Sequence, residues 1–206
     1  MESPDREPRV ARVAVGLGNP GPEYEGTRHN VGFEVLDHLA RHEGLLFQPP
    51  RSLEDYRGPR GFLCARSFEP DALLVKPQTW MNLSGTVVAP IVHWARVEPA
   101  QLLVVYDDMD LPLGSLRIRP HGGAGGQKGM RSILDCLGSD RFPRLRVGIG
   151  RPRTDAARHV LAEFSSEERV EMDISVAEAS EAVLHWLLEG DIEKCMTRFH
   201  SRWSRD

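Results

Sequence analysis

The stretch QLLVVYDD, residues 101–108, constrains the fold more than any other part of the chain. It is apolar without interruption from Leu102 to Tyr106, and two aspartates follow. A strand with one face in water alternates polar and apolar residues, whereas a strand covered on both faces does not. This segment is therefore predicted to be a central strand of a sheet that is covered by helices on both sides.

Strand and helix patterns alternate along the rest of the chain. Strands are predicted near residues 12–17, 61–67, 72–76, 101–106, 115–119 and 144–149, and helices near 30–43, 83–96, 127–137 and 166–199. The helices that connect successive strands imply that most strands are parallel. Short connections link strands 61–67 and 72–76, and strands 101–106 and 115–119, so these are expected to add antiparallel strands to the sheet. We expect an α/β fold, a single-domain three-layer α/β/α sandwich with a mixed, mostly parallel sheet.

The length of 206 residues suits one domain with its own core. We expect a disordered lead over residues 1–10, a folded domain over 11–200 and a tail over 201–206. The lead lacks the apolar core of a signal peptide, and no apolar run approaches the ~20 residues of a membrane span. The three cysteines form no C-x-x-C pair, which suits reduced thiols. These features predict a cytoplasmic protein with no membrane partner.

Two helical segments carry features that bear on packing. In the last helical region one apolar face is expected to pack on the core, with a role in docking as the second interpretation; it consists of Val170, Ile174, Ala177, Leu184, Leu187 and Leu188. Pro90 lies inside the helix predicted at 83–96, where it either kinks the helix or sets its boundary.

The stretch VAVGLGNPG, residues 13–21, contains the pattern G-x-G-x-x-G of dinucleotide-binding loops. Such a loop needs a helix to begin at the third glycine, so that backbone N–H groups meet the phosphates. Here the segment PEYEGTRHN follows, which Pro22 and Gly26 mark as a loop, and Pro20 removes one donor. We therefore do not expect a dinucleotide site.

The net charge of −4 hides an uneven distribution. Residues 112–153 contain nine Arg or Lys residues and two acids, a net charge of +7, whereas residues 154–193 contain eleven acids and two arginines, a net charge of −9. The basic region 112–153 is compatible with binding of a nucleic acid. The alternative is that the two regions form solvated surfaces of opposite charge with no such partner.

Polar clusters follow three predicted strands, at the sheet edge where ligands gather in folds of this type. His29 lies just before a predicted helix, whose N-terminus disfavours imidazolium, and a carboxylate on the other ring nitrogen would fix the tautomer. Both effects suit a general base, and we expect Asp107 as the orienting partner. A histidine with a purely structural role is the alternative. No serine or cysteine occupies a nucleophile elbow.

A zinc site is the obvious competitor for this chemistry. His38 and His42 lie four residues apart in a predicted helix, but the first lacks an adjacent glutamate and no third ligand is evident. We expect neither a metal nor another cofactor.

Five segments in this order and spacing resemble the bacterial-type peptidyl-tRNA hydrolases. They are VGLGNPG with the following EY and TRHNVGF, then KPQTWMNLSG, DDMDLPLG, GGAGGQKGMRSI and RLRVGIGRP. The resemblance runs from about Val13 to Arg151. It implies a monomeric, metal-independent α/β esterase that cleaves the ester between a stalled peptide and its tRNA, and so recycles both.

The resemblance also implies roles for individual residues. His29 would activate water and Asp107 would be its partner. Asn19 and Asn82 would hold the peptide backbone and the attacked carbonyl region. An amide side chain suits that task because it offers both a donor and an acceptor to any peptide main chain.

The remaining contacts, to the tRNA end or the peptide, would come from Tyr24 and Trp80. The sequence departs from the family pattern in the glycine-rich segment, where Gln127 and Lys128 replace a histidine and an asparagine. Lys128 is expected to meet a tRNA phosphate in place of the lost amide contact. A non-catalytic RNA-binding or splicing-cofactor module on the same fold is the alternative function, although it would have no need of a base at His29.

Overall fold

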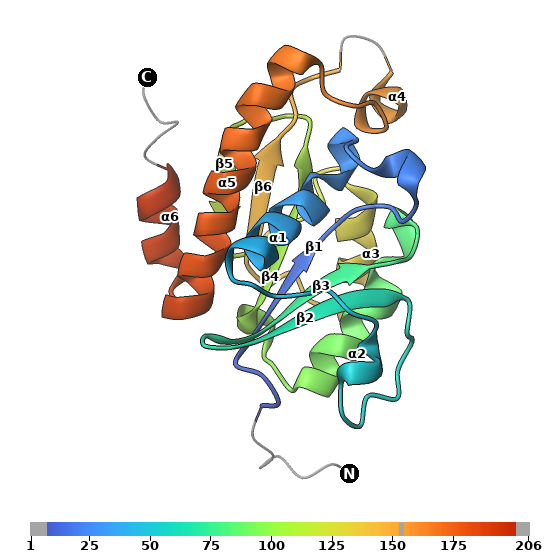
Figure 1. Cartoon of the computed structure of the whole chain (residues 1–206), viewed down its shortest axis with the longest axis vertical. Coiled ribbons are helices and arrows are strands. Elements are labelled where there is room, and N and C mark those ends of the chain that lie inside the picture. The colour runs from blue at the N-terminus through green and yellow to red at the C-terminus, as the bar shows by residue number, and fades with distance from the viewer. Residues whose placement is uncertain (1–7, 153–154, 201–206) are drawn as a thin grey trace.

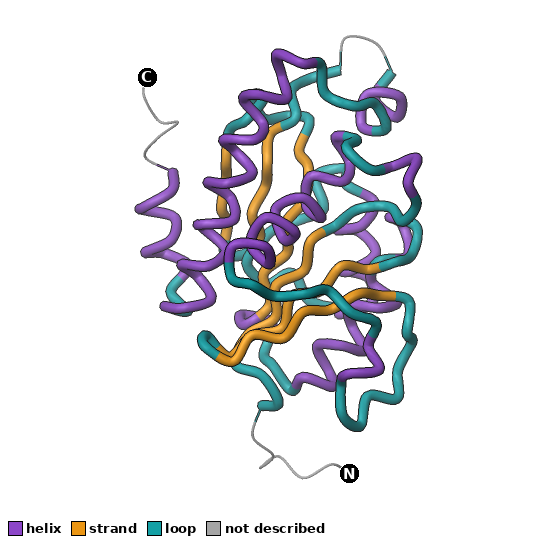
Figure 2. The backbone as a smooth tube through the Cα atoms, viewed as in Figure 1, coloured by secondary structure: helices purple, strands orange, loops and turns teal. Residues whose placement is uncertain are grey.

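The strand β4 (Leu102–Asp108) lies at the centre of the molecule, and all of its seven residues are buried. The computed structural model describes residues 8–152 and 155–200. Their backbone forms one sheet between two helical layers (Figure 1, Figure 2). The uninterrupted apolar run in β4 is thus explained by cover on both faces.

The other elements alternate along the chain much as the sequence predicts. The strands are β1 (Arg12–Gly16), β2 (Phe62–Phe68), β3 (Asp71–Pro77), β4, β5 (Leu116–Arg119) and β6 (Arg144–Gly148). The helices are α1 (Val31–His42), α2 (Gly85–Ala95), α3 (Lys128–Leu137), α4 (Ala156–Val160), α5 (Ser166–Glu189) and α6 (Ile192–His200). The short helix α4 was not predicted.

The six-stranded sheet is mixed, with the order β2-β3-β1-β4-β6-β5. The inner strands pair in parallel, whereas β2 pairs antiparallel to β3 and β5 antiparallel to β6. The strand β5 is antiparallel to the inner strands, as expected, but it pairs with β6 and not with β4. The crossover through α3 returns β6 to lie parallel beside β4, so that β5 is left at the edge of the sheet.

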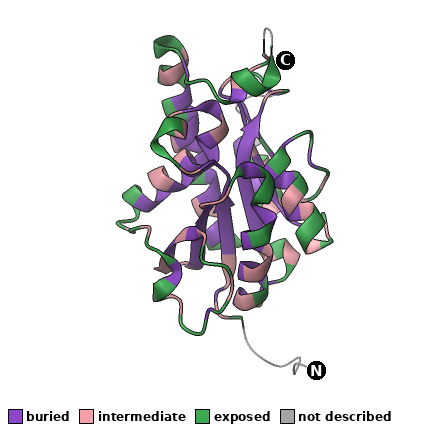
Figure 3. Cartoon of the chain, turned by 90° about the vertical axis from the view of Figure 1, so that its right-hand side faces the viewer, coloured by how far each residue is buried: buried purple, intermediate pink, exposed green. Residues whose placement is uncertain are grey.

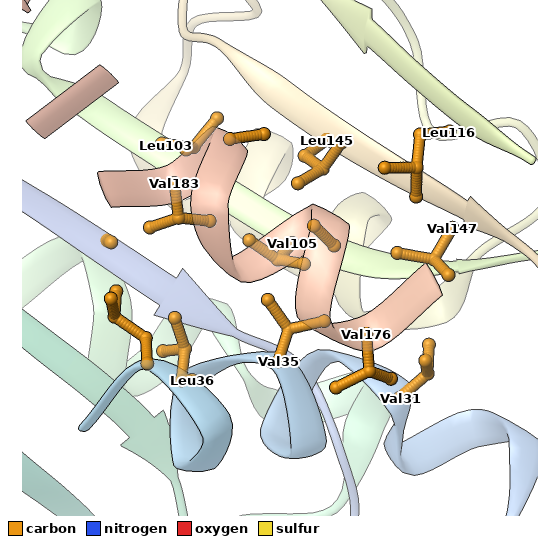
Figure 4. Close-up of a cluster of buried hydrophobic side chains, with 14 of the residues drawn as sticks. Val31, Val35, Leu36, Leu103, Val105, Leu116, Leu145, Val147, Val176 and Val183 are labelled. Carbon is orange, nitrogen blue, oxygen red and sulfur yellow. The ribbon is translucent and has the colours of Figure 1, made fainter. Parts of the chain in front are cut away.

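Two hydrophobic clusters lie on opposite faces of the sheet and define the three layers. Helices α1, α5 and α6 cover one face, and α2 and α3 cover the other. In the first cluster, valines of α1 and α5 meet Val105 of β4 and Val147 of β6 (Figure 4). A view from the side shows buried strands between helices that are exposed on their outer faces (Figure 3).

The prediction of which apolar residues of α5 pack on the core is wrong in part. Leu187 is buried, but Val170, Ile174 and Leu188 are 66%, 63% and 58% exposed. The helix instead buries a face that includes Met172, Val176, Ala179, Val183 and Trp186. This face contains the large indole of Trp186, and burial of that side chain explains why this face of α5, rather than the predicted one, packs on the sheet.

Pro90 lies inside α2, which continues through it from Gly85 to Ala95. At the N-terminus, the N–H of Arg9 donates to the carbonyl oxygen of Ala95 (2.9 Å) and Val10 is fully buried. The packed region therefore begins before residue 11, earlier than predicted. The rest of the predicted lead, residues 1–7, and the predicted tail, residues 201–206, lie outside the described residues.

Two glycines bring α1 close to the sheet. A Cβ atom on Gly16 would lie 2.2 Å from the carbonyl oxygen of Gly32, and one on Gly32 would lie 2.4 Å from the carbonyl oxygen of Val105. The first glycine of the G-x-G-x-x-G pattern thus permits close helix–strand packing, and the start of α1 is held beside the carboxyl ends of β1 and β4.

Candidate active site

His29 and Asp107 are in contact at the carboxyl edge of the sheet. His29 belongs to a short 3-10 helix, Arg28–Asn30, which leads into α1, and Asp107 lies near the end of β4. Nδ1 of the imidazole is 2.9 Å from Oδ2 of the carboxylate. The side chain of His29 is 11% exposed and that of Asp107 is 3% exposed. Because a carboxylate accepts, this contact places the proton on Nδ1 and leaves the lone pair of Nε2 for another group.

Arg28 anchors the segment that carries His29. Its side chain is 8% exposed, stacks on the ring of Phe164 at 4.6 Å and donates to Glu168 of α5 at 2.6 Å. The hydrogen bond from Arg28 lowers the pKa of Glu168. The backbone N–H of Arg28 also donates to the carbonyl oxygen of Ala162 (3.0 Å). The segment before α5 and the first turn of α5 therefore anchor the residue that directly precedes His29.

Asn19 and Asn30 lock two loops together beside this pair. The backbone N–H of Asn19 donates to Oδ1 of Asn30 (2.8 Å), and Nδ2 of Asn30 donates to the carbonyl oxygen of Asn19 (3.0 Å). The side-chain Oδ1 of Asn19 accepts from the N–H of Met81 (2.8 Å). Oδ1 of Asn19 is therefore engaged within the protein, and Nδ2 is the donor end of the same side chain.

Gln127 is a residue of the site whose contacts sequence reasoning missed. It lies immediately before α3, and Oε1 accepts from the N–H of Met130 (2.8 Å) as an N-cap. Its Nε2 donates to Oδ1 of Asp107 (3.1 Å) and lies 3.2 Å from the sulfur of Met81. The sequence signal for the cap was the polar residue at a helix start, but nothing in the sequence placed it against Asp107.

The other predicted site residues surround these contacts. Asn82 is exposed and directly follows Met81, and Lys128 is exposed and directly follows Gln127. The rings of Tyr24 and Trp80 meet edge to face at 5.8 Å, and Trp80 is 53% exposed. The aromatic pair joins the loop after β1 to the loop after β3, and so offers an apolar surface at the same edge of the sheet.

Two hollows in the surface adjoin the network of contacts. The larger, of about 950 Å³, is lined by Asn19 and Asn30 and continues along the outer side of α1; neither His29 nor Asp107 lines it. The smaller, of about 540 Å³, lies between α2 and α3 and is lined by Asn82 and Lys128, among others. The residues predicted to bind the substrate are divided between the two hollows, with Asn19 at the larger and Asn82 and Lys128 at the smaller. The contact between His29 and Asp107, rather than the volume of a hollow, marks the candidate site.

Basic side chains lie on the α2–α3 side of the sheet. In β5, Leu116 and Ile118 are buried in the cluster on the α5 side, so the alternating Arg117 and Arg119, both exposed, project toward the α3 side. Arg131 on α3 is exposed as well. The acidic helix α5 packs on the other face, so the two oppositely charged regions of the sequence are separated by the sheet.

The histidines considered for zinc do not come together with further ligands. Nδ1 of His38 lies 2.9 Å from the hydroxyl of Ser180, and Nδ1 of His42 lies 2.8 Å from a carboxylate oxygen of Glu43. Within residues 8–152 and 155–200, no group of three or more His, Cys, Asp or Glu residues is placed to hold a metal ion. In the same part of the chain, no helix is long and apolar enough to cross a membrane.

Comparison with known proteins identifies a common family. Residues 13–206 match the family model described as peptidyl-tRNA hydrolase. A peptidyl-tRNA hydrolase of Syntrophomonas wolfei is 49% identical over 179 residues, which are 87% of this chain and 94% of that protein. One of Carboxydothermus hydrogenoformans is 46% identical and covers 91% of this chain, with 97% of its own length matched. The crystal structure of peptidyl-tRNA hydrolase from Acinetobacter baumannii superposes with a TM-score of 0.82 at 31% identity, covering 92% of this chain and 94% of that one.

Proposed function

The chain belongs to the peptidyl-tRNA hydrolase family, and we infer that it hydrolyses the ester bond between peptide and tRNA in peptidyl-tRNA. The observation that links this function to named residues is the contact of His29 with Asp107. Exposed amide, aromatic and basic side chains lie in the neighbouring loops and at the start of α3, namely Asn82, Trp80 and Lys128. The alternative of a non-catalytic RNA-binding or splicing-cofactor module has no support from the relatives.

In the proposed reaction, Nε2 of His29 takes a proton from a water molecule as its oxygen attacks the ester carbonyl carbon. Asp107 holds the ring in the required tautomer and stabilises the imidazolium that forms. When the tetrahedral intermediate collapses, the imidazolium returns the proton to the departing ribose hydroxyl of the tRNA. The peptide leaves with a free carboxyl group, which releases its proton to solvent, the tRNA leaves with a free ribose hydroxyl, and the histidine is regenerated as the neutral imidazole.

The side chains of Asn19 and Asn82 are proposed to hold the peptide. Because Oδ1 of Asn19 already accepts from Met81, Asn19 contributes a donor only, toward a carbonyl oxygen of the peptide backbone. The exposed amide of Asn82 is able to contribute a donor and an acceptor. These contacts read the main chain, so they suit a substrate whose side chains vary.

Lys128 and the neighbouring arginines are proposed to meet the tRNA. Lys128 is exposed at the start of α3, on the same side of the sheet as Arg117 and Arg119. A protein of net charge −4 needs such a local basic surface to approach a polyanion. Tyr24 and Trp80 would stack with the single-stranded end of the tRNA or pack on the peptide.

We further propose that the enzyme acts as a monomer in the cytoplasm, with no metal or other cofactor. None of the three cysteines forms a disulfide, as expected of a reducing compartment. The proposed mechanism uses only side chains of the chain itself.

The function is tested with N-acetylaminoacyl-tRNA and the matching unblocked aminoacyl-tRNA as paired substrates. The purified protein is expected to release the blocked amino acid and to leave the unblocked ester largely intact. Spontaneous hydrolysis without protein supplies the baseline for both. Release of the blocked amino acid at only the baseline rate, across a range of buffers, would contradict the proposed function.

A further inference from the structure

The carboxylate of Asp107 has a second polar partner besides His29. Oδ2 faces Nδ1 of His29 at 2.9 Å, and Oδ1 accepts from Nε2 of Gln127 at 3.1 Å. A carboxylate held at one oxygen is free to turn about its Cβ–Cγ bond, whereas contacts at both oxygens fix its plane. The direction in which Oδ2 meets the imidazole thus depends on Gln127.

Gln127 is itself held so that its NH2 group points at Asp107. Its side chain is buried, and Oε1 is occupied by the N–H of Met130 at 2.8 Å. That cap identifies the oxygen end of the amide, because a backbone N–H requires an acceptor. The nitrogen end is then left facing Asp107 and the sulfur of Met81.

We propose that Gln127 is a positioning residue of the hydrolase, which orients Asp107 and, through it, the base His29. This inference rests on the proposed function, since it assigns a task only if His29 is the base. Gln127 is not proposed to touch the substrate. It acts by connecting the first turn of α3 to the carboxylate at the end of β4.

A neutral amide performs this task without a charge of its own. The titratable groups that face Gln127 are Asp107 on β4 and, beyond it, His29 before α1. Lys128 follows on α3 but is exposed, and Met81 on the loop after β3 is neutral. The next carboxylate, Asp108, accepts from Nε of Arg146 on β6. The amide therefore adds no ionisation to the pair over the working pH range.

Two substitutions separate positioning from helix capping. Gln127→Ser keeps a good N-cap but is too short to reach Asp107. Gln127→Glu keeps the length and the capping oxygen, but replaces the donor with a second carboxyl group beside Asp107. The two carboxyl groups remain together only while they share a proton. Gln48→Glu, the same change at an exposed position, is the matched control.

The measurement is the pH dependence of kcat on N-acetylaminoacyl-tRNA, with circular dichroism to monitor folding. For Gln127→Ser we expect kcat to fall roughly 10- to 100-fold, the range typical of lost outer partners of an active group. KM should stay near wild type, and the melting temperature should fall only modestly, because the helix cap is kept while Oδ1 of Asp107 loses its donor. For Gln127→Glu we expect kcat relative to wild type to fall as the pH rises and the proton shared by the two carboxyl groups is lost. Gln48→Glu should keep the pH profile of wild type.

Unchanged kcat and pH profiles in both variants would show that Gln127 only caps α3, and would overturn the proposal. Loss of folding in both variants would overturn it as well, because the side chain would then serve mainly to hold the helix. Failure of the proposed function is a distinct result: wild type itself would then release no blocked amino acid in the same assay.

Discussion

Replacement of Asn19 by aspartate changes only one end of the side chain and therefore gives a sharp test of substrate selection. Oδ1 of Asn19 accepts from the N–H of Met81 at 2.8 Å, and an aspartate oxygen accepts from the same N–H. The loop is therefore expected to keep its structure. What changes is the other end of the side chain, where a donor becomes a negatively charged acceptor.

The size of the effect follows from two contributions. Loss of a neutral hydrogen bond to the peptide carbonyl costs about 1 kcal/mol with the blocked substrate. The new charge attracts the α-ammonium of the unblocked substrate by about 1 kcal/mol at a separation of about 4 Å in water-like surroundings. Together these change the relative kcat/KM of the two substrates by about 2 kcal/mol, or roughly 30-fold, since about 1.4 kcal/mol corresponds to a factor of ten.

The assay measures kcat/KM for N-acetylaminoacyl-tRNA and aminoacyl-tRNA with wild type and Asn19→Asp. The control is Asn19→Ala, which loses the same donor without gaining a charge and should move the ratio by only the first contribution. It also leaves the buried N–H of Met81 unpaired, so its melting temperature should fall. If Asn19→Asp keeps the wild-type ratio, Asn19 does not read the peptide backbone.

Three further predictions concern the tRNA contact, the anchor of His29 and the independence from metals. Lys128→Ala should raise KM far more than it lowers kcat, and reduce the salt slope of tRNA binding by about one ion; a collapse of kcat with an unchanged slope would contradict the phosphate contact. The hydrogen bond from Arg28 lowers the pKa of Glu168, so the ion pair stabilises the folded protein above about pH 4.3. This stabilisation is lost as the pH falls through the lowered pKa of Glu168. The melting temperature of Glu168→Gln should therefore lie below that of wild type at pH 7 and approach it in acid, and a gap that does not narrow would refute this role. Activity should survive exhaustive chelation, whereas loss that Zn²⁺ restores would point back to His38 and His42.

The sequence predicted those parts of the fold that depend on the pattern of single elements. The apolar run of β4 placed it at the centre of the sheet, and the rule that ligands gather at the carboxyl ends of strands was sufficient to pair His29 with Asp107. The partner of β5 was not predictable in the same way. It depends on where the α3 crossover returns, which no local pattern records.

The contacts that complete the site depend on side-chain directions that only the packed structure fixes. Gln127 meets Asp107 because the cap of α3 turns its NH2 group inward, and Asn30 meets Asn19 because Gly16 and Gly32 permit close packing. Val170 was predicted to be buried but is exposed, because α5 carries two apolar faces and the sequence does not show which one packs on the sheet.

The most direct test of His29 as the base is the single-turnover rate of His29→Ala on saturating N-acetylaminoacyl-tRNA, together with the Kd for the same substrate. We expect a fall of ~10²- to 10⁴-fold in the rate, as is typical of a lost general base, with little change in Kd. Asp107→Ala, which removes orientation but not the proton acceptor, should be less severe in the same assay. A wild-type rate in His29→Ala, with activity abolished in Asp107→Ala, would show that His29 is not the base and would exchange the roles of the two residues.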